Sequence, residues 1–384
     1  MSRHGAPGST SVMSDFRDLN PGLRHGELLT MSLTQPDRAK QNEHRAIVVG
    51  AGVAGSVCGR DLAAAGWSVT LLDKARGPGG RASSRRIEPH RFDHGAQYFT
   101  VRSESFQRGV DSMASRGTVK LWRPRTAHIN SSGISIDDVD DEPSNRHPRW
   151  VACPGMNDLV RDLQHGLDIN FQHHVERIER AADGWEVTCA DAARTASAPN
   201  LVLAIPAPQA TALLTDQPEI RCRLEAVRMQ PCWAVMIAYD RTLDVPFDAA
   251  RVEAGPLRWV ARQSSRPDRS PLESWVLHAS PEWSRDHLEA ESKIIAEDLQ
   301  REFERILQVA GLEGTVSPVL CTAHRWRYAL VDQPLGAPYL WCAASRIGLC
   351  GDWCLGPRIE AAYESGRELA QCLLRRREAR AQAV

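Results

Sequence analysis

Two short apolar runs, separated by a glycine-rich segment, mark the start of the regularly patterned part of the chain. Residues 46–50 read AIVVG, a β-branched run that ends in a glycine turn, and residues 67–73 read WSVTLLD. Between them, residues 55–66 consist mainly of helix-forming residues and end at Gly66. This order of strand, glycine turn, helix and strand predicts a βαβ unit, which is how a doubly wound parallel sheet opens.

Later hydrophobic runs predict a second sheet. Their density between residues 200 and 280 favours a mostly antiparallel arrangement. Apolar residues at helical spacing predict a helix over 284–310, capped by Ser284 and ended by Gly311. Residues 346–376 read as a strand, a loop and a helix that return to the first sheet. The strand candidates lie at 169–178, 184–190, 201–206, 231–240, 257–262 and 274–280.

The pattern as a whole predicts an α/β fold with a Rossmann-like nucleotide-binding domain and a second, mostly antiparallel sheet domain. We expect the first domain to be discontinuous, over 45–100, 150–205 and 340–384. The substrate domain then takes 101–149 and 206–339. Residues 1–44 are polar, rich in Gly and Pro and without a period, which predicts a disordered extension. Residues 127–148 combine turn formers with an acidic run and predict a long exposed loop.

Composition narrows the class of partner. The 384 residues carry a formal net charge of −1, so nothing indicates a general attraction to nucleic acid or to an acidic membrane surface. We expect a small-molecule partner. The chain has no apolar run of about 20 residues and no secretory signal, which favours a cytoplasmic protein. The ten cysteines are scattered, and CGDWC at 350–354 lacks the spacing of a metal site, so we expect no metal.

The first motif with chemical meaning is GAGVAG at residues 50–55. Gly50 permits the tight turn, Gly52 lets the backbone approach a pyrophosphate, and Gly55 allows close packing of helix and strand. Asp73 ends the next strand about 20 residues later, where a carboxylate accepts hydrogen bonds from ribose hydroxyls. The motif therefore predicts a bound dinucleotide, and by itself it leaves FAD and NAD open.

Two further motifs favour FAD. Residues 76–81 read RGPGGR directly after the ribose acid, where glycines free backbone N–H groups for an anion and Arg81 can neutralise phosphate charge. Flavoproteins of the amine-oxidase and hydroxylase type carry a second glycine-arginine motif at this place. Near the C-terminus, Gly351 and Asp352 end a strand before a turn and a helix that begins near Arg358. In such flavoproteins this segment holds the ribityl chain and a flavin carbonyl.

Seven longer strings resemble the renalase family, particularly its bacterial members, from about residue 45 to 375. They are FDHGAQYFTVR (92–102), RWVACPGMNDL (149–159), LAIPAPQATALL (203–214), PCWAVMIAY (231–239), SWVLHASPEWSR (274–285), HRWRYA (324–329) and the GDWC segment (351–354). The sequence departs from the family pattern at Gly356-Pro357 and at Ala362-Tyr363, although an aromatic residue is kept at 363.

The resemblance implies a p-hydroxybenzoate-hydroxylase-like fold with noncovalent FAD. It also implies an oxidase that takes hydride from 2- and 6-dihydro-NAD(P) onto flavin N5, returns NAD(P)+ and passes electrons to oxygen as hydrogen peroxide. Together, the motifs and the resemblance give the expected FAD-binding residues: Gly50, Gly52, Val53, Ala54, Gly55, Asp73, Lys74, Gly80, Arg81, Gln97, Tyr98, Val175, Gly351, Asp352, Arg358 and Ile359.

The expected reaction needs no catalytic base, because loss of hydride from a dihydropyridine gives an aromatic cation directly. Positioning should therefore dominate. His278 is either a partner for the substrate carboxamide or a structural residue of its strand, and the sequence favours neither. Two alternatives stay open, an FAD-dependent amine oxidase or desaturase on the same scaffold and a flavin-binding protein without turnover. The candidates for the substrate site are Tyr98, His278, Arg325, Trp326, Tyr328 and Tyr363.

Overall fold

The computed structural model describes residues 43–136, 147–191 and 193–382. Almost all of the predicted N-terminal extension (1–44) therefore lies outside the described residues. The same is true of 137–146, the acidic part of the predicted loop.

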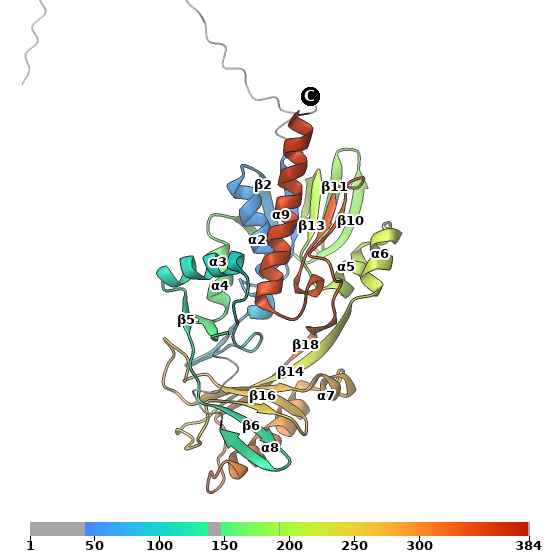
Figure 1. Ribbon diagram of the computed structural model, residues 1–384. Coiled ribbons are helices and arrows are strands. Elements are labelled where there is room, and N and C mark those ends of the chain that lie inside the picture. The colour runs from blue at the N-terminus through green and yellow to red at the C-terminus, as the bar shows by residue number, and fades with distance from the viewer. Residues whose placement is uncertain (1–42, 137–146, 192, 383–384) are drawn as a thin grey trace, which may run out of the picture. The chain divides into compact units, whose positions relative to one another are not determined.

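A six-stranded sheet of order β19-β20-β13-β1-β2-β9 forms the upper part of the molecule in Figure 1. The strands pair in parallel except for β19, which is antiparallel to β20. The inner strands are continuous apolar runs because both faces of the sheet are covered. The strands are β1 (Arg45–Val49), β2 (Ser68–Asp73), β9 (Asp168–Phe171), β13 (Asn200–Leu203), β19 (Leu340–Cys342) and β20 (Ile347–Leu349).

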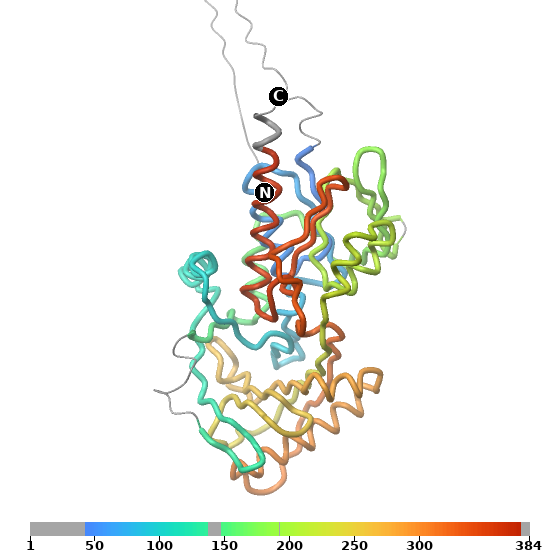
Figure 2. The backbone as a smooth tube through the Cα atoms, turned by 45° about the vertical axis from the view of Figure 1, so that its right-hand side comes forward, coloured from blue at the N-terminus to red at the C-terminus, as the bar shows by residue number. Residues whose placement is uncertain are grey.

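Helices α2 and α9 cover one face of this sheet, and the C-terminal helix α9 packs directly against α2. Both Figures 1 and 2 show α9, in red, running beside the blue N-terminal part of the sheet domain. The close approach requires a glycine, because a Cβ on Gly366 would lie 2.2 Å from the backbone oxygen of Ala54. The helices are α2 (Val53–Ala64), α3 (Glu104–Ser115), α4 (Asn157–Leu163), α5 (Ala207–Leu213), α6 (Pro218–Glu225) and α9 (Ile359–Gln382).

A second sheet of seven strands, of order β18-β14-β17-β16-β15-β6-β7, lies below the first in Figure 1. All neighbours are antiparallel except β15 and β6. Helix α8 packs its apolar face onto this sheet. The elements are β6 (Thr126–Asn130), β7 (Gly133–Ile136), β14 (Arg228–Ala238), β15 (Ala249–Val252), β16 (Leu257–Arg262), β17 (Ser274–Ala279), β18 (Leu320–Gln333), α7 (Pro281–Asp286) and α8 (Ser292–Val309).

Smaller elements complete the fold around these two sheets. A three-stranded sheet contains β10 (Val175–Ala181), β11 (Gly184–Cys189) and β12 (Thr195–Ala198). Two antiparallel pairs are the hairpin of β3 (Arg85–Ile87) with β4 (His90–Phe92), and the more distant pair of β5 (Val119–Leu121) with β8 (Trp150–Ala152). The short 3₁₀ helices are η1 (Gly80–Ala82) and η3 (Asp352–Cys354).

The predicted fold class is confirmed, whereas three local predictions were wrong. Residues 126–136 are not a loop but the β6–β7 hairpin, because Ala127 and Ile129 are buried while Ser131, Ser132 and Gly133 supply the turn. The strand predicted at 169–178 splits into β9 and β10 at Gln172, whose φ is 59°.

The third error concerns the helix predicted at 284–310. The segment forms two helices, α7 and α8. Ser280, and not Ser284, caps α7, because its side chain accepts a hydrogen bond from the Trp283 amide. The predicted end is confirmed, since Gly311 follows α8 with φ +94°. The division into a discontinuous nucleotide domain and a substrate domain stays a prediction.

We expect Gly366→Ala to destabilise the protein by about 1–3 kcal/mol, because the added methyl group forces α2 and α9 apart. Chemical denaturation of the apoprotein measures this. Gly77→Ala is the matched control, since nothing lies within 4 Å of a Cβ at Gly77. Equal stability of the two variants would contradict the tight α2–α9 contact.

Candidate active site

A cavity of about 2490 Å³ is lined by residues of both large sheets and by all three sequence motifs. Every residue predicted to bind cofactor lines it except Gly55, and every predicted substrate-site residue lines it except Tyr363. The sequence therefore located the walls of one cavity from segments more than 250 residues apart.

The glycines of the first motif have three different environments. Gly50 has φ +100°, and a Cβ there would lie 2.6 Å from the Ala204 oxygen. A Cβ on Gly55 would lie 1.9 Å from the Gly50 oxygen, which explains why Gly55 packs inside the fold instead of lining the cavity. Around Gly52, by contrast, nothing lies within 4 Å of the Cβ position. The start of α2 thus offers an open backbone surface to an anion.

Asp73 ends β2 and braces the glycine turn. Its carboxylate oxygens accept hydrogen bonds from the backbone amides of Ala51 and Ala75, both at 2.7 Å. Each oxygen keeps a second lone pair, so the carboxylate can still accept a ribose hydroxyl. Lys74 and Val175 line the same end of the cavity.

Arg81 forms a paired ionic contact with Asp352 across 271 positions of sequence. Nη1 donates to Oδ2 at 2.9 Å and Nη2 to Oδ1 at 2.5 Å. The fork of Arg81 is thus committed to a carboxylate, where the sequence predicted phosphate. The pair joins the glycine-arginine motif to the C-terminal motif. Around the pair, the cavity is lined by Val53, Ala54, Gly80, Gly351, Arg358 and Ile359.

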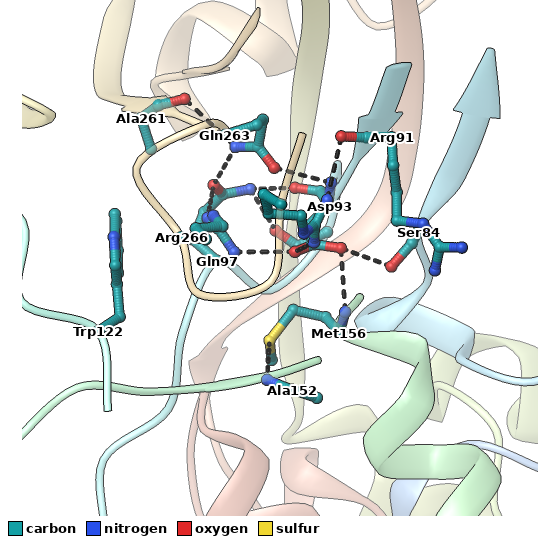
Figure 3. Close-up of polar contacts among 12 residues, drawn as sticks. Ser84, Arg91, Asp93, Gln97, Trp122, Ala152, Met156, Ala261, Gln263 and Arg266 are labelled. Carbon is teal, nitrogen blue, oxygen red and sulfur yellow. Dashed lines mark hydrogen bonds and ion pairs between the residues drawn. The ribbon is translucent and has the colours of Figure 1, made fainter. Parts of the chain in front are cut away.

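A buried ionic cluster lies behind the cavity wall and is drawn in Figure 3. The carboxylate of Asp93 is fully buried and accepts hydrogen bonds from Ser84 Oγ, from the Met156 amide at 3.0 Å and from Arg266 Nη1 at 2.9 Å. Arg269 donates to the same carboxylate. Burial lowers the pKa of Arg266 to about 10, so this guanidinium is charged at neutral pH. The cluster therefore sets two guanidinium groups against one carboxylate.

Gln97 belongs to this cluster, which changes its predicted role. Its Nε2 donates to the backbone oxygens of Asp93 and Gly95, and its Oε1 accepts from Arg266 Nη2 at 2.6 Å and from Gln263 Nε2 at 3.4 Å. The amide thus has no donor or acceptor left for a ligand. A contact between Gln97 and FAD would have to come from its backbone.

Tyr98, the next residue, faces aromatic neighbours on the cavity wall. Its ring centroid lies 5.7 Å from that of Trp259 and 6.2 Å from that of Trp122. The guanidinium of Arg149 lies over the Tyr98 ring at 5.3 Å, within the range of a cation–π contact.

The backbone oxygen of His94 ties this loop to the second sheet. It accepts hydrogen bonds from Trp326 Nε1 at 2.9 Å and from His278 Nε2 at 3.2 Å. The rings of His94, His324 and Trp326 pack together, with centroids 4.5–5.2 Å apart. Burial is the main cause that lowers the pKa of His94 to about 3 and those of His278 and His324 to about 4. All three histidines are therefore neutral at neutral pH.

The remaining substrate-site candidates divide. Tyr328 lines the cavity. Arg325 also lines it, and its Nη1 donates to the Leu288 oxygen at 2.5 Å and to Glu289 Oε2 at 2.7 Å, so its contact with a substrate phosphate stays a prediction. Tyr363 is 3% exposed and packs against Phe106 with ring centroids 5.0 Å apart. The prediction that Tyr363 belongs to the substrate site was wrong, because its face of α9 turns into the core.

The charge of the cavity is strongly asymmetric. Thirteen arginine and lysine residues line it, and the acidic residues that do so are Asp73, Glu176, Glu253 and Asp352. Several of these arginines also pair with acids that do not line the cavity, so the net positive charge of the wall is smaller than the difference between basic and acidic residues. Its sign nevertheless favours anionic ligands.

Comparison with known proteins identifies the family. The family described as flavin containing amine oxidoreductase matches residues 127–374, and an NAD(P)-binding Rossmann-like domain matches 48–112. The chain belongs to the flavin-containing amine oxidoreductases. It is an FAD-dependent oxidoreductase, and the open backbone at Gly52 with Asp73 beside it fits that cofactor. Within the described residues, no helix has the length and apolarity needed to cross a membrane.

Several individual proteins are similar to this chain over part or most of its length. A phytoene desaturase (neurosporene-forming) of Cereibacter sphaeroides is 49% identical over 57 residues, covering 15% of this chain and 11% of the desaturase. The chain thus spans about a tenth of that relative. Two solved structures share the fold at 13% identity. One is assigned as a protoporphyrinogen oxidase from Exiguobacterium (TM-score 0.68, covering 86% of this chain and 98% of that one). The other is a cyclohexylamine oxidase from Brevibacterium oxydans (TM-score 0.67, covering 87% and 99%).

Sequence reasoning missed Asp93, Arg266 and His94 as determinants of the site. His94 and Asp93 lie inside the string FDHGAQYF, so their position beside Gln97 was visible. Their partners were not, because Arg266 is 173 positions away from Asp93 and nothing in its own segment marks it.

We expect Arg81→Ala to lose most of its FAD during purification, because the substitution leaves the carboxylate of Asp352 unpaired at the cavity wall. The ratio of flavin to protein absorbance measures this. Arg76→Ala is the comparison, since Arg76 lines the cavity on the same loop and should keep more FAD. Full flavin content in Arg81→Ala would refute this role for the pair.

The buried histidines predict a loss of stability in acid. Because the pKa of His278 is about 4 in the folded protein against an ordinary 6.5, the unfolded state binds the proton first. The free energy of unfolding should therefore fall as the pH drops from about 6.5 to about 4. His278→Gln should reduce that slope by up to about one proton in urea unfolding. An unchanged slope in His278→Gln would contradict a neutral imidazole at this position.

Proposed function

We propose that this protein is an FAD-dependent oxidase of isomeric dihydronicotinamides. The substrates are the 2- and 6-dihydro forms of NAD(P), and the products are NAD(P)+ and hydrogen peroxide formed from oxygen. The resemblance of seven sequence strings to renalases suggests the reaction. The observation that carries it against an amine substrate is the charge of the cavity.

Amines that such enzymes oxidise are cations in neutral water, whereas NAD(P) carries a pyrophosphate. A wall with thirteen basic and four acidic residues repels the first and attracts the second. Size supports the same choice. Ordinary ligand pockets measure roughly 300–1,000 Å³, and the 2490 Å³ here leaves room for a dinucleotide beside FAD.

The residues of the aromatic wall suit a reaction that depends on positioning. FAD, when bound, supplies an acceptor for the substrate hydride. His278 and His324 are neutral, and they line the cavity together with Trp326, Trp259 and Tyr98, whose aromatic faces can stack with a nicotinamide ring. Loss of hydride produces the pyridinium directly, so the low pKa values of these histidines do not obstruct the reaction.

An amine oxidase or desaturase activity is the second candidate. The family, the amine-oxidase folds and the local match to a phytoene desaturase favour it. The lysines of the cavity argue against an amine oxidase. Amine oxidases that use a lysine beside the flavin would need it in the second sheet. Among the described residues that line this cavity, the lysine is Lys74, which lies next to Asp73 at the glycine motif.

Anaerobic mixing of the purified holoenzyme with 6- or 2-dihydro-NAD(P) tests the proposal. We expect rapid bleaching of the visible flavin band, followed by recovery and hydrogen peroxide when oxygen is admitted. Putrescine and cyclohexylamine serve as the matched amine substrates and should leave the band unchanged. Bleaching by the amines alone would select the second candidate, and bleaching by neither would refute both oxidase assignments.

A further inference from the structure

One row of side chains crosses six strands of the second sheet. The strand pairing places His324 opposite Ala234, Ala234 opposite His278 and His278 opposite Trp259. It continues from Trp259 to Arg251 and from Arg251 to His128. Residues directly opposite one another across a sheet share a face. All members of this row except the small Ala234 line the cavity, so the row runs along its floor.

The chemistry of the row changes from one end to the other. Its first half, on β18, β14 and β17, contains the neutral histidines His324 and His278 on either side of Ala234 and lies beside Trp326. Its second half, on β15 and β6, contains Arg251 and His128. Trp259 on β16 separates the two halves. Because neighbouring strands are about 4.8 Å apart, the cationic end begins one strand beyond the aromatic wall.

Two more cations join the second half. A register shift between Leu257 and Trp259 marks a bulge, and Arg258 in that bulge lines the cavity. Arg149 is 5% exposed, donates Nη1 to Thr126 Oγ1 at 3.0 Å and also lines the cavity. Arg251 and Arg258 form no ion pair with any residue that the structure describes. Glu253, the carboxylate at this edge, is not joined to either of them.

We propose that Arg251 and Arg258 form the phosphate-binding subsite for the substrate, at the end of the cavity opposite GAGVAG. The inference rests on the proposed function and deepens it. A nicotinamide stacked beside Trp259 has its pyrophosphate one ribose away, and Arg251 lies opposite Trp259 on the next strand of the sheet. Arginine suits this position because its planar fork binds phosphate oxygens in pairs.

Arg251→Met in the holoenzyme tests the subsite by two independent measurements. Calorimetric titration with inorganic pyrophosphate should show affinity lowered by about 10- to 100-fold. In anaerobic flavin reduction, the KM for 6-dihydro-NAD should rise by about 10-fold with a much smaller change in limiting rate. The KM for the dihydronicotinamide riboside, which lacks phosphate, should rise far less. Arg251→Lys should recover part of the pyrophosphate affinity.

Arg241→Met is the matched control, because Arg241 is exposed and lies outside the cavity. It should match the wild type in every measurement, and FAD content and thermal unfolding verify that each variant is folded. Equal pyrophosphate affinity in wild type and Arg251→Met, or equal KM changes for dinucleotide and riboside, overturns the subsite. If no dihydronicotinamide reduces the wild-type flavin while Arg251→Met still loses pyrophosphate affinity, the proposed function fails and the anion subsite stands.

Discussion

The buried carboxylate of Asp93 is the constraint on which the arrangement of the site depends. A charge with no exposure to water is costly to keep unless it is paired and hydrogen-bonded. Here Ser84 and Met156 supply hydrogen bonds, and Arg266 and Arg269, on the loop between β16 and β17, supply guanidinium groups. Satisfying one carboxylate therefore fixes two parts of the fold against each other. Breaking such a buried pair costs about 3–5 kcal/mol.

The loop that follows Asp93 takes its position from this cluster. Arg266 Nη2 donates to Gln97, and Trp326 and His278 donate to the His94 oxygen. The loop is thereby fixed at residues 94 and 97, and Tyr98 follows directly and lines the cavity. A loop fastened at both ends in this way can present an aromatic side chain at a defined place without regular secondary structure.

The fold could be predicted from sequence where the determinants are local. The strand, turn and helix around the glycine motif and the strand at 257–262 are short patterns whose meaning does not depend on distant residues, and the structure agrees with both. The β6–β7 hairpin was mistaken for loop because turn formers and a following acidic run mask five residues of strand pattern. Arg251 pairs with His128 of that hairpin, so its place beside the cavity was missed together with the hairpin.

The roles of individual side chains could be predicted less well. The spacing of Arg81 behind Asp73 indicated an anion but could not show that the anion is Asp352, 271 positions away. The string containing Gln97 placed it at the cavity but could not show that its amide is saturated. Tyr363 was assigned to the cavity because an aromatic residue stands at a family position, whereas the rotation of α9 turns it toward Phe106.

Each side chain of the row that crosses the second sheet comes from a different strand. A single substitution changes one contact while the backbone pairing on either side, which does not depend on the side chain, stays the same. Each side chain along the floor of the cavity can thus change while the strands that carry its neighbours keep their pairing. A substitution at the cationic end therefore changes the charge of that part of the floor, while the histidines and Trp259 further along the row keep their neighbours.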